Sequence, residues 1–215
     1  MSKKVNGKEK GRLSRQRILK EAERLFARQG YSGTGLRELA AAAGVNLAMI
    51  NYFFGSKKQL LKEILDGFLA GYLEVARQEL QGDEEVRVRL DRFVRRAVAY
   101  FASHRDALLV TIAELPRDDP EIIEYKAAWG RQMMEIIDRE ICQPLAREGS
   151  RRLSPHLIGP LLTSMMASRF LFAPVMERMA GGGEVSGGRE YAELVSRIVL
   201  DGIEGERNHN YGSVN

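Results

Sequence analysis

The side chains best suited to recognising another molecule lie between Asn46 and Lys57, in the stretch NLAMINYFFGSK. A helix over residues 47–54, turning about 100° per residue, would point Ile50 and Phe54 inward. Its outer face would then carry methyl, thioether, amide and phenol groups, on Ala48, Met49, Asn51 and Tyr52. No charged side chain lies on this face, so nothing on it repels a close approach.

These groups are of the kind that read the major groove of DNA. An asparagine amide can pair with adenine, and the methyl groups of alanine or methionine can contact thymine. The Tyr52 hydroxyl can reach a phosphate, and Lys57 begins the next helix, where its charge and the backbone amides can do the same. Arg37, in the preceding helix, is placed to reach the backbone or a base edge. The alternative is that these helices belong to the core of an enzyme.

A helix-turn-helix over residues 35–54 would hold this face in place. Thr34 is the expected cap of its first helix, and Gly44 is expected to end that helix in the left-handed conformation. Asn46 then caps the outward-facing helix. A short helix supported in this way fits the major groove.

The charge is concentrated at the N-terminus. Residues 1–17 hold seven lysines and arginines and one glutamate, a net charge of +6. The whole chain carries +4, so the remainder carries −2. This distribution favours a polyanion partner near the N-terminus. A solvated tail that aids solubility explains the same charges, and residues 1–12 are expected to be disordered.

Helical spacing continues along the rest of the chain, and no alternating pattern typical of strands is present. The expected helices are 14–29, 34–43, 47–54, 56–80, 84–102, 103–115, 118–149, 154–179 and 189–204. Start signals include a capping box from Ser56 to Gln59 and Asp119 before Pro120. We therefore predict an all-α fold of about nine helices, in which a long helix joins the N-terminal helices to a bundle.

Four segments also resemble a known family. The segments ILKEAERLF, GYSGT, LAAAAGVN and NYFFGSKKQL follow the order and spacing of the DNA-binding domain of the tetracycline repressor (TetR) family. The match covers residues 14–64, about a quarter of the chain, and identifies it as a member of that family.

The resemblance implies which residues contact DNA. Carried over position by position, they are Thr34, Arg37, Asn46, Leu47, Ala48, Met49, Asn51, Tyr52, Phe53 and Lys57. This chain departs from the family at two of them, because the family often has tyrosine at the position of Asn51 and histidine at that of Phe53. Phe53 cannot donate to a phosphate, and Asn51 is expected to read a base instead.

The resemblance also implies that the C-terminal bundle binds a small molecule. The helix over 118–149 carries an apolar stripe at four-residue spacing, although such a stripe is also typical of an ordinary core. With neighbouring aromatic residues, the expected ligand-binding set is Phe68, Tyr72, Phe101, Tyr125, Trp129 and Met133. The polar complement is left open among His104, Glu114 and Arg169.

In the family, the last two helices form a dimer. Here the helix over 154–179 is apolar on more than one face, as a helix that touches both its own core and a partner should be. The expected interface residues are Leu161, Leu162, Met165, Met166 and Phe170.

Enzyme and metal chemistry find little support. The three histidines, His104, His156 and His209, lie far apart, and no hydrolase, zinc or phosphate-loop motif is present. An all-helical enzyme using Glu114 and His104 is the remaining alternative of that class. Cys142 has no partner cysteine for a disulfide or zinc site and is expected to be buried and inert. We predict no catalytic residues, no cofactor and no metal.

No uninterrupted apolar run reaches the roughly 18 residues of a membrane span, and the basic N-terminus does not look like a secretory signal. The expected compartment is the cytoplasm, with no membrane partner. The expected domains are a basic arm (1–12), a DNA-binding domain (13–60), a ligand-binding and dimerisation domain (61–205) and a tail (206–215). The predicted function is a homodimeric repressor released from a palindromic operator by a largely apolar effector. A regulator without an effector is the alternative.

Overall fold

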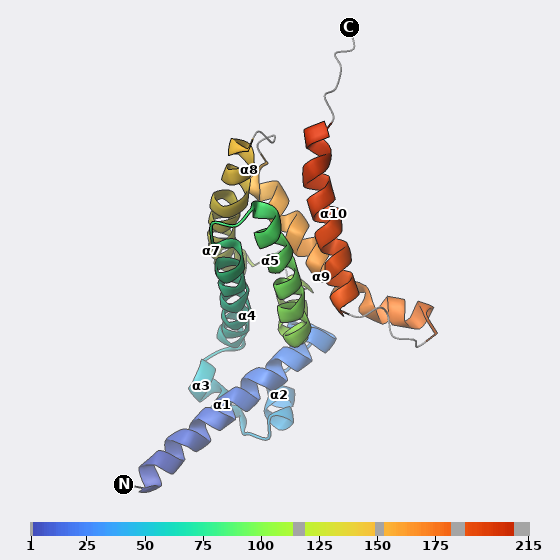
Figure 1. The fold of residues 1–215 in the computed structure, drawn as a ribbon. Coiled ribbons are helices and arrows are strands. Elements are labelled where there is room, and N and C mark those ends of the chain that lie inside the picture. The colour runs from blue at the N-terminus through green and yellow to red at the C-terminus, as the bar shows by residue number, and fades with distance from the viewer. Residues whose placement is uncertain (1, 114–118, 149–152, 182–187, 209–215) are drawn as a thin grey trace. The chain divides into compact units, whose positions relative to one another are not determined.

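The computed structural model describes residues 2–113, 119–148, 153–181 and 188–208 (Figure 1). Within these ranges the elements are α1 (Ser2–Gln29), α2 (Leu36–Ala42), α3 (Leu47–Phe54), α4 (Lys57–Leu80), α5 (Val86–Ser103), α6 (Arg105–Ala113), α7 (Pro120–Ile137), η1 (Asp138–Cys142), α8 (Gln143–Arg147), α9 (Pro155–Met179) and α10 (Gly188–Asn208).

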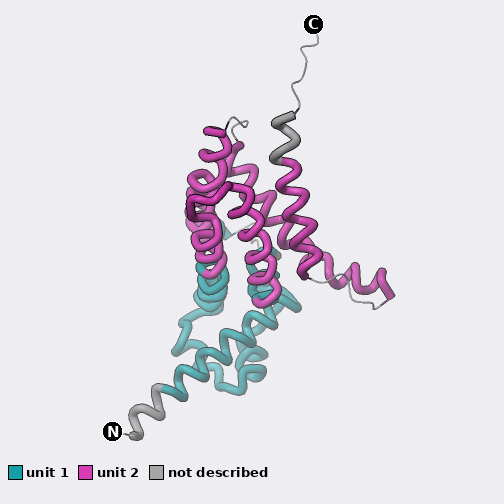
Figure 2. The backbone as a smooth tube through the Cα atoms, in the orientation of Figure 1, with its two compact units in different colours: residues 1–70, 104–123 teal, residues 71–103, 124–215 magenta. Residues whose placement is uncertain are grey.

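The chain forms two compact units, each built from two separate stretches of sequence (Figure 2). Unit 1 comprises residues 1–70 and 104–123, and unit 2 comprises residues 71–103 and 124–215. We expected one boundary near residue 60, so the division differs from that expectation. The reason is that α6 packs along α1 and thereby joins the N-terminal helices instead of the bundle.

Unit 1 is organised around α1. Ile18, Ala22 and Phe26 are buried at four-residue spacing along this helix, as an amphipathic helix requires. Both α2 and α3 pack against α1, and α6 packs against it as well. The three short helices therefore share a small apolar core that fixes the orientation of α3.

The expectation of a disordered arm over residues 1–12 is wrong for residues 2–12, because α1 begins at Ser2. Lysine, arginine and glutamate lose little rotamer freedom in a helix, so this charged segment can extend the helix that follows it. An ion pair between Arg12 and Glu9, with 2.6 Å between Nη2 and Oε1, supports the same turn.

The core of unit 2 lies where α5 meets α9 and α10. Phe93 and Phe101 of α5 are fully buried there, as is Met166 of α9. Arg89, near the start of α5, is also buried, and it forms an ion pair with Glu140 of η1 at 3.4 Å. The bundle thus combines an apolar core with one nearly buried charge pair.

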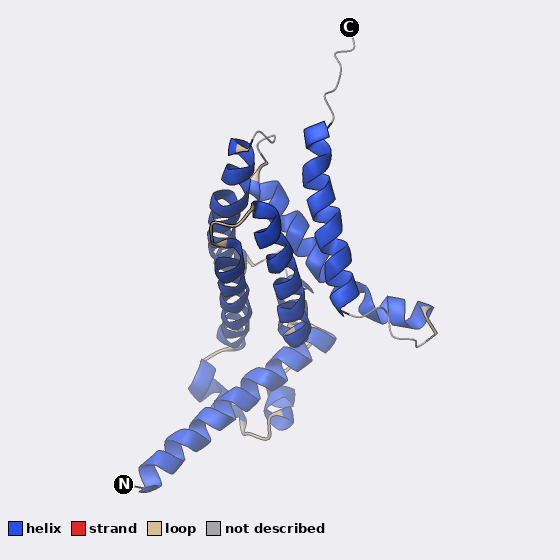
Figure 3. Cartoon of the chain, viewed as in Figure 1, coloured by secondary structure: helices blue, strands red, loops and turns tan. Residues whose placement is uncertain are grey.

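The segments α7, η1 and α8 form a continuous helix with one wider turn at η1. We predicted a kink near Pro144, whose ring cannot pack against the carbonyl group four residues earlier in a regular helix. The π-helical turn lies directly before this proline and changes the hydrogen-bond spacing there. Counted as one, these segments bring the described helices to nine, and the predicted all-α class is confirmed (Figure 3).

Helix α9 is apolar on two faces. Leu162, Met166 and Phe170 are buried in unit 2, whereas Leu161 and Phe172 are more than half exposed. By length and composition α9 is apolar enough to cross a membrane, although 28% of its most apolar window is buried within the chain. The sequence expectation used a different criterion, an uninterrupted apolar run of about 18 residues, and Thr163, Ser164 and Arg169 interrupt the run in α9.

Candidate nucleic-acid interface and effector region

The turn between α2 and α3 is built by backbone hydrogen bonds around a glycine. The amide of Val45 donates to the carbonyl of Ala40 at 3.0 Å, and the amide of Gly44 donates to the carbonyl of Ala41 at 3.1 Å. These two bonds form a Schellman motif, which needs a left-handed residue directly after the helix. Gly44 supplies it with φ of 63°, as predicted.

The start of α3 is held by its predicted cap. The Oδ1 atom of Asn46 accepts a hydrogen bond from the amide of Met49 at 2.9 Å. Ile50 and Phe54 are buried on the inner face, and α3 ends at Gly55, where φ is 73°. Because its oxygen holds the helix, Asn46 is a cap first, and only its NH₂ group remains for a base.

The outer face of α3 is as predicted at its centre. Ala48, Asn51 and Tyr52 are exposed, and Tyr52 retains 83% of its accessible surface. Leu47 and Met49 are half-buried at the edges of this face. An aromatic residue normally buries most of its ring within its own chain, so the exposed Tyr52 is a candidate for contact with another molecule.

Phe53 lies differently from an exposed contact residue. Its side chain is half-buried, and its ring packs edge-on against Tyr52, with 5.1 Å between centroids. A Cβ atom at Gly11 of α1 would lie 3.9 Å from the Phe53 ring, so α1 passes close to it. Phe53 therefore supports the position of Tyr52.

Thr34 is buried, with 2% of its surface exposed. Its hydroxyl donates to the carbonyl of Gly30 at 2.9 Å, so it stabilises the link between α1 and α2. The expectation that Thr34 caps α2 is wrong: the N-cap is Gly35, which has no side chain to do so. A hydrogen bond back to the carbonyl of Gly30, four residues earlier, takes the place of the expected cap, and Thr34 is not presented at the surface.

The two predicted basic contact residues have different surroundings. Arg37 is exposed in the first turn of α2. The Lys57 ammonium lies 4.3 Å from the centroid of the Tyr31 ring, a cation–π distance that fixes its direction. Ser56 caps α4 through the amide of Gln59 at 3.0 Å, as predicted. The first turn of α4 thus combines a positioned lysine with a capped helix start.

Sequence reasoning missed the structural role of Arg15, which in the sequence is only one more charge of the basic N-terminus. Its guanidinium pairs with Glu63 of α4 and lies 5.1 Å from the centroid of the Phe54 ring. Arg15 therefore ties α1 to α3 and α4. A glutamate 48 residues away in sequence gives no local signal, so this pairing could not be predicted.

Two of the predicted ligand-binding residues meet in unit 2. The rings of Tyr72 and Phe101 lie 5.0 Å apart, and the Tyr72 hydroxyl is 3.1 Å from Oγ1 of Thr163. Burial raises the pKa of Tyr72 to about 12, although the Thr163 hydrogen bond acts in the opposite direction. Tyr72 is therefore a neutral donor or acceptor inside an aromatic cluster that also includes Phe93 and Phe170.

On α7, Met133 is buried and Tyr125 and Trp129 are half-buried. Phe68 is buried in the part of α4 that belongs to unit 1. Their role in binding a ligand stays a prediction. A pocket of about 410 Å³ lies elsewhere in unit 2 and contains none of them; its lining is Arg95, Val98, Ala99, Ala102, Gly188, Arg189 and Ala192.

The candidate polar partners do not converge on one another. His104 is exposed, and the Arg169 guanidinium lies 5.9 Å from the centroid of the Tyr191 ring. Glu114 and His209 lie outside the described residues. Within the described part of the chain, no group of three histidine, cysteine, aspartate or glutamate side chains could hold a metal ion. Cys142 is buried, as predicted.

The predicted dimer residues are only partly at the surface. Leu162, Met166 and Phe170 are buried in the core of their own unit, so they cannot contact a second copy, whereas Leu161 is exposed and Met165 is half-buried. For these three buried residues the prediction is wrong, because it took all apolar residues of α9 together. Phe172 is exposed as well, and sequence reasoning missed the other exposed apolar residues of this helix: Leu157, Leu171, Val175, Met176 and Met179.

Comparison with known proteins agrees with the geometry of unit 1. Residues 18–64 match the model of the family described as bacterial regulatory proteins, tetR family. A probable HTH-type transcriptional regulator from Bacillus subtilis, YttP, is 28% identical over 162 residues, which span 71% of this chain and 75% of the relative. The HTH-type transcriptional repressor AcnR from Corynebacterium efficiens is 26% identical over 199 residues, 86% of this chain and 92% of AcnR.

A solved structure is similar over both units. The regulator AibR, in complex with isovaleryl coenzyme A and operator DNA, superposes with a TM-score of 0.69 at 17% identity, covering 86% of this chain and 97% of AibR. This likeness shows the shared fold. With the family match at the helix-turn-helix and the relatives that span most of the chain, it leads to one assignment: residues 18–64 form a DNA-binding domain of the tetR family of bacterial regulatory proteins, and most of the chain is similar to transcriptional regulators.

Proposed function

We propose that two copies of this chain repress transcription by binding a palindromic DNA site through α3. A small, largely apolar molecule bound in the bundle then releases them. The observation that carries this proposal is the outer face of α3, where Ala48, Asn51 and the 83% exposed Tyr52 stand on a helix fixed by its neighbours. Such a protein works in the cytoplasm, where bacterial DNA lies.

Each side chain on this face has a distinct task. Asn51 is placed to form paired hydrogen bonds with an adenine edge, and Ala48 leaves room for a thymine methyl group. Tyr52, held by the edge-on ring of Phe53, donates to a phosphate. Arg37, which precedes α3 in the sequence, and Lys57, which follows it, add positive charge for contacts to phosphates. Phosphate contacts set the position of α3, and Asn51 supplies the choice of sequence.

The exposed apolar face of α9 supports a homodimer. Leu157, Leu161, Phe172, Val175 and Met179 lie within about 60° of one direction around this helix and are each more than half exposed. The neighbouring α10 adds Leu194 and Ile198, each 51% exposed. An apolar patch over two packed helices is typical of a site covered by another protein. Two-fold pairing would present two copies of α3 to a palindrome.

The ligand-responsive part rests on the interior of the bundle. AibR, which has the same fold, is described with both a ligand and operator DNA. In this chain the aromatic cluster around Tyr72 and the stripe on α7 are the proposed ligand-binding surface. A ligand there lowers DNA affinity only by as much as it prefers the conformation that does not bind DNA.

Selection from randomised DNA duplexes tests the proposal. The full chain should enrich a palindrome with half-sites about one helical turn apart. A variant with Tyr52→Ala and Arg37→Ala should enrich nothing. Enrichment of a single, asymmetric site, or of the same palindrome by this variant, would contradict the assignment of α3 as the reading helix.

A second measurement tests the dimer. The double variant Leu161→Glu and Phe172→Glu places charges on the exposed face of α9, and it should sediment as a monomer with its helical content intact. Glu177→Gln, a surface change on the same helix, is the matched control and should remain dimeric. If the double variant still sediments as a dimer, the interface lies elsewhere.

A further inference from the structure

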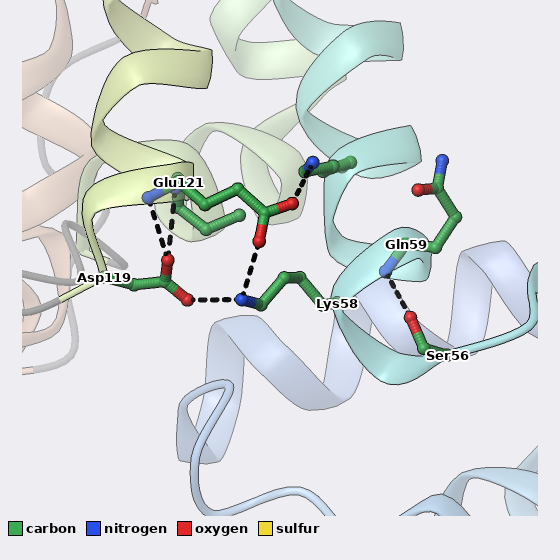
Figure 4. Close-up of polar contacts among 7 residues, drawn as sticks. Ser56, Lys58, Gln59, Asp119 and Glu121 are labelled. Carbon is green, nitrogen blue, oxygen red and sulfur yellow. Dashed lines mark hydrogen bonds and ion pairs between the residues drawn. The ribbon is translucent and has the colours of Figure 1, made fainter.

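A group of four charged residues joins the start of α4 to the start of α7 within unit 1 (Figure 4). The Lys58 ammonium lies 2.8 Å from Oδ2 of Asp119 and 3.0 Å from Oε2 of Glu121. The Lys62 ammonium lies 2.6 Å from the other carboxylate oxygen of Glu121. We refer to Lys58, Lys62, Asp119 and Glu121 as the α4–α7 ion-pair network.

Hydrogen bonds to the backbone fix this network at its α7 end. Oδ1 of Asp119 accepts from the amides of Glu121 and Ile122, at 3.1 and 3.3 Å, and so caps α7. Its second oxygen remains for Lys58. Ile122 is buried, with 1% of its surface exposed, which anchors this turn in the core. The Asp119 carboxylate is therefore held in place by the backbone of α7 as well as by Lys58.

Helix electrostatics explain why α4 needs these partners. A helix N-terminus carries a partial positive charge, which disfavours lysine there. The first turn of α4 nevertheless contains Lys57 and Lys58 and has no acidic residue. Asp119 and Glu121 of α7 supply the missing negative charge. The hydrogen bonds to Asp119 and Glu121 raise the pKa of Lys58, and the lysines lower the pKa of both carboxyl groups. Lys58, Asp119 and Glu121 are thus ionised at neutral pH.

The position of the network along the two helices gives it a role beyond local stability. Lys58 follows the end of α3 by four residues, and it is adjacent to Lys57, the proposed phosphate contact. Glu121 precedes Trp129 by eight residues, or about two turns, on the same uninterrupted helix. The network therefore joins the helix that follows the DNA-reading element to the helix that carries the proposed ligand-binding stripe.

We propose that Lys58, Lys62, Asp119 and Glu121 are positioning residues through which DNA binding at α3 and the conformation of α7 affect each other. This rests on the proposed DNA-binding function. Isolated exposed ion pairs contribute little, whereas a network with fixed geometry is the exception. Because such coupling is reciprocal, it can be followed from the DNA side without knowing the effector. Trp129, the single tryptophan of the chain, reports on α7.

The experiment uses the full chain and the duplex that it selects from randomised DNA. Emission from Trp129 is recorded in the free and DNA-bound states of four proteins: wild type, Glu121→Lys, Lys62→Glu with Glu121→Lys, and Glu124→Lys. The third protein restores opposite charges between positions 62 and 121 with the wild-type net charge and leaves Lys58 with Asp119 as its partner. The fourth is the matched control, since Glu124 is three residues further along α7 and pairs with Arg131 of that helix, not with α4.

DNA should shift the Trp129 emission of the wild type, of the double variant and of Glu124→Lys. Glu121→Lys should still bind the duplex and should show no emission shift. An unchanged shift in Glu121→Lys, an equal loss in Glu124→Lys, or the absence of a shift in the wild type would each overturn the proposal.

Hydrogen exchange without DNA separates this proposal from the proposed function. If wild type selects no duplex, the DNA-binding function fails on its own. The coupling is then decided by amide exchange in α3 and α7. Both helices should exchange faster in Glu121→Lys than in Glu124→Lys and recover in the double variant. Faster exchange confined to the first turn of α7 would overturn the proposal.

Discussion

Individual side chains on α3 divide into supports and contacts. Asn46 and Phe53 resemble contact residues in sequence, yet one caps the helix and the other packs against Tyr52 and near α1. Asn51 and Tyr52 remain fully directed outward. Recognition therefore depends on few residues, and substitutions at these two positions should have different consequences.

Asn51→Ala should relax the preference for one base pair in each half-site by about 1–3 kcal/mol, because alanine cannot hydrogen-bond to a base edge. Tyr52→Phe should weaken binding to all sequences by about 1 kcal/mol, because it removes a phosphate hydrogen bond without changing the ring. Selection from randomised duplexes and direct titration of each variant with matched duplexes distinguish the loss of base preference from the uniform loss of affinity. An unaltered selected motif for Asn51→Ala would show that Asn51 does not read a base.

Glu23 of α1 is a residue whose ionisation should oppose folding. Burial raises its pKa, Asp106 of α6 raises it further, and His104 and Lys20 lower it. The folded protein therefore binds the proton more tightly than the unfolded chain does. Stability is lost as pH rises from about 4.5, the usual value for a glutamate, through the raised pKa, and it is constant above that.

Glu23→Gln should accordingly raise the melting temperature at pH 7, and the gain should shrink as the pH falls toward about 4.5. Glu21→Gln is the control on the same helix; Glu21 pairs with Arg24 at 2.8 Å, and its substitution should not stabilise. Thermal melts across this pH range give the comparison. A gain for Glu23→Gln that does not depend on pH would point to packing instead of ionisation.

Local features of α3 could be predicted from sequence, whereas long-range ones could not. The cap at Asn46, the left-handed Gly44 and the buried Ile50 each depend on residues within a few positions. The pairing of Arg15 with Glu63 could not be predicted, because the two residues lie 48 positions apart in the sequence. The side of α9 that faces the core could not be predicted either, since apolar residues occur all around that helix.

At the scale of elements, the junction of α4, α5 and η1 depends on one arginine. Arg89 donates to the carbonyl groups of Leu80 and Glu84, the second at 2.9 Å from Nε, and pairs with Glu140 at 3.4 Å. The carbonyl of Leu80 belongs to the last residue of α4, where no helical amide can reach it. Arg89 therefore closes the end of one helix and fixes the next.

Arg89→Met should reduce the free energy of unfolding by about 2–4 kcal/mol, because it keeps much of the side-chain volume and leaves buried acceptors without their donor. Arg92→Met, at a half-buried site that pairs with Glu79 and Glu84, should cost much less because water can bond to the groups that Arg92 leaves. Urea denaturation of both variants measures the difference. Equal decreases would show that burial of Arg89 is not what matters.

At the scale of the whole molecule, charge should govern the strength of DNA binding. Residues 1–17 carry +6 and the remainder −2, but Arg12 and Arg15 are engaged with Glu9 and Glu63. The other positive charges of this segment are Lys3, Lys4, Lys8, Lys10 and Arg17. Their phosphate contacts would add to the salt dependence and not to the sequence preference.

Replacing Lys3, Lys4, Lys8 and Lys10 with glutamine should weaken binding to every duplex alike. The slope of log affinity against log salt should become shallower by about 0.9 for each phosphate that these lysines no longer neutralise. Titrations at several salt concentrations, with selected and scrambled duplexes, provide the test. An unchanged slope would remove these lysines from the interface.

The interleaved sequence of the two units has a consequence for protein engineering. A chimera of two such regulators could be made by joining the DNA-binding part of one chain to the bundle of another within α4. Here α6, which comes from residues 105–113, packs along α1 and belongs to unit 1. A chimera joined after residue 70 would therefore set a foreign α6 against the native α1. A transplant that carries residues 104–123 with the head keeps both sides of that contact native.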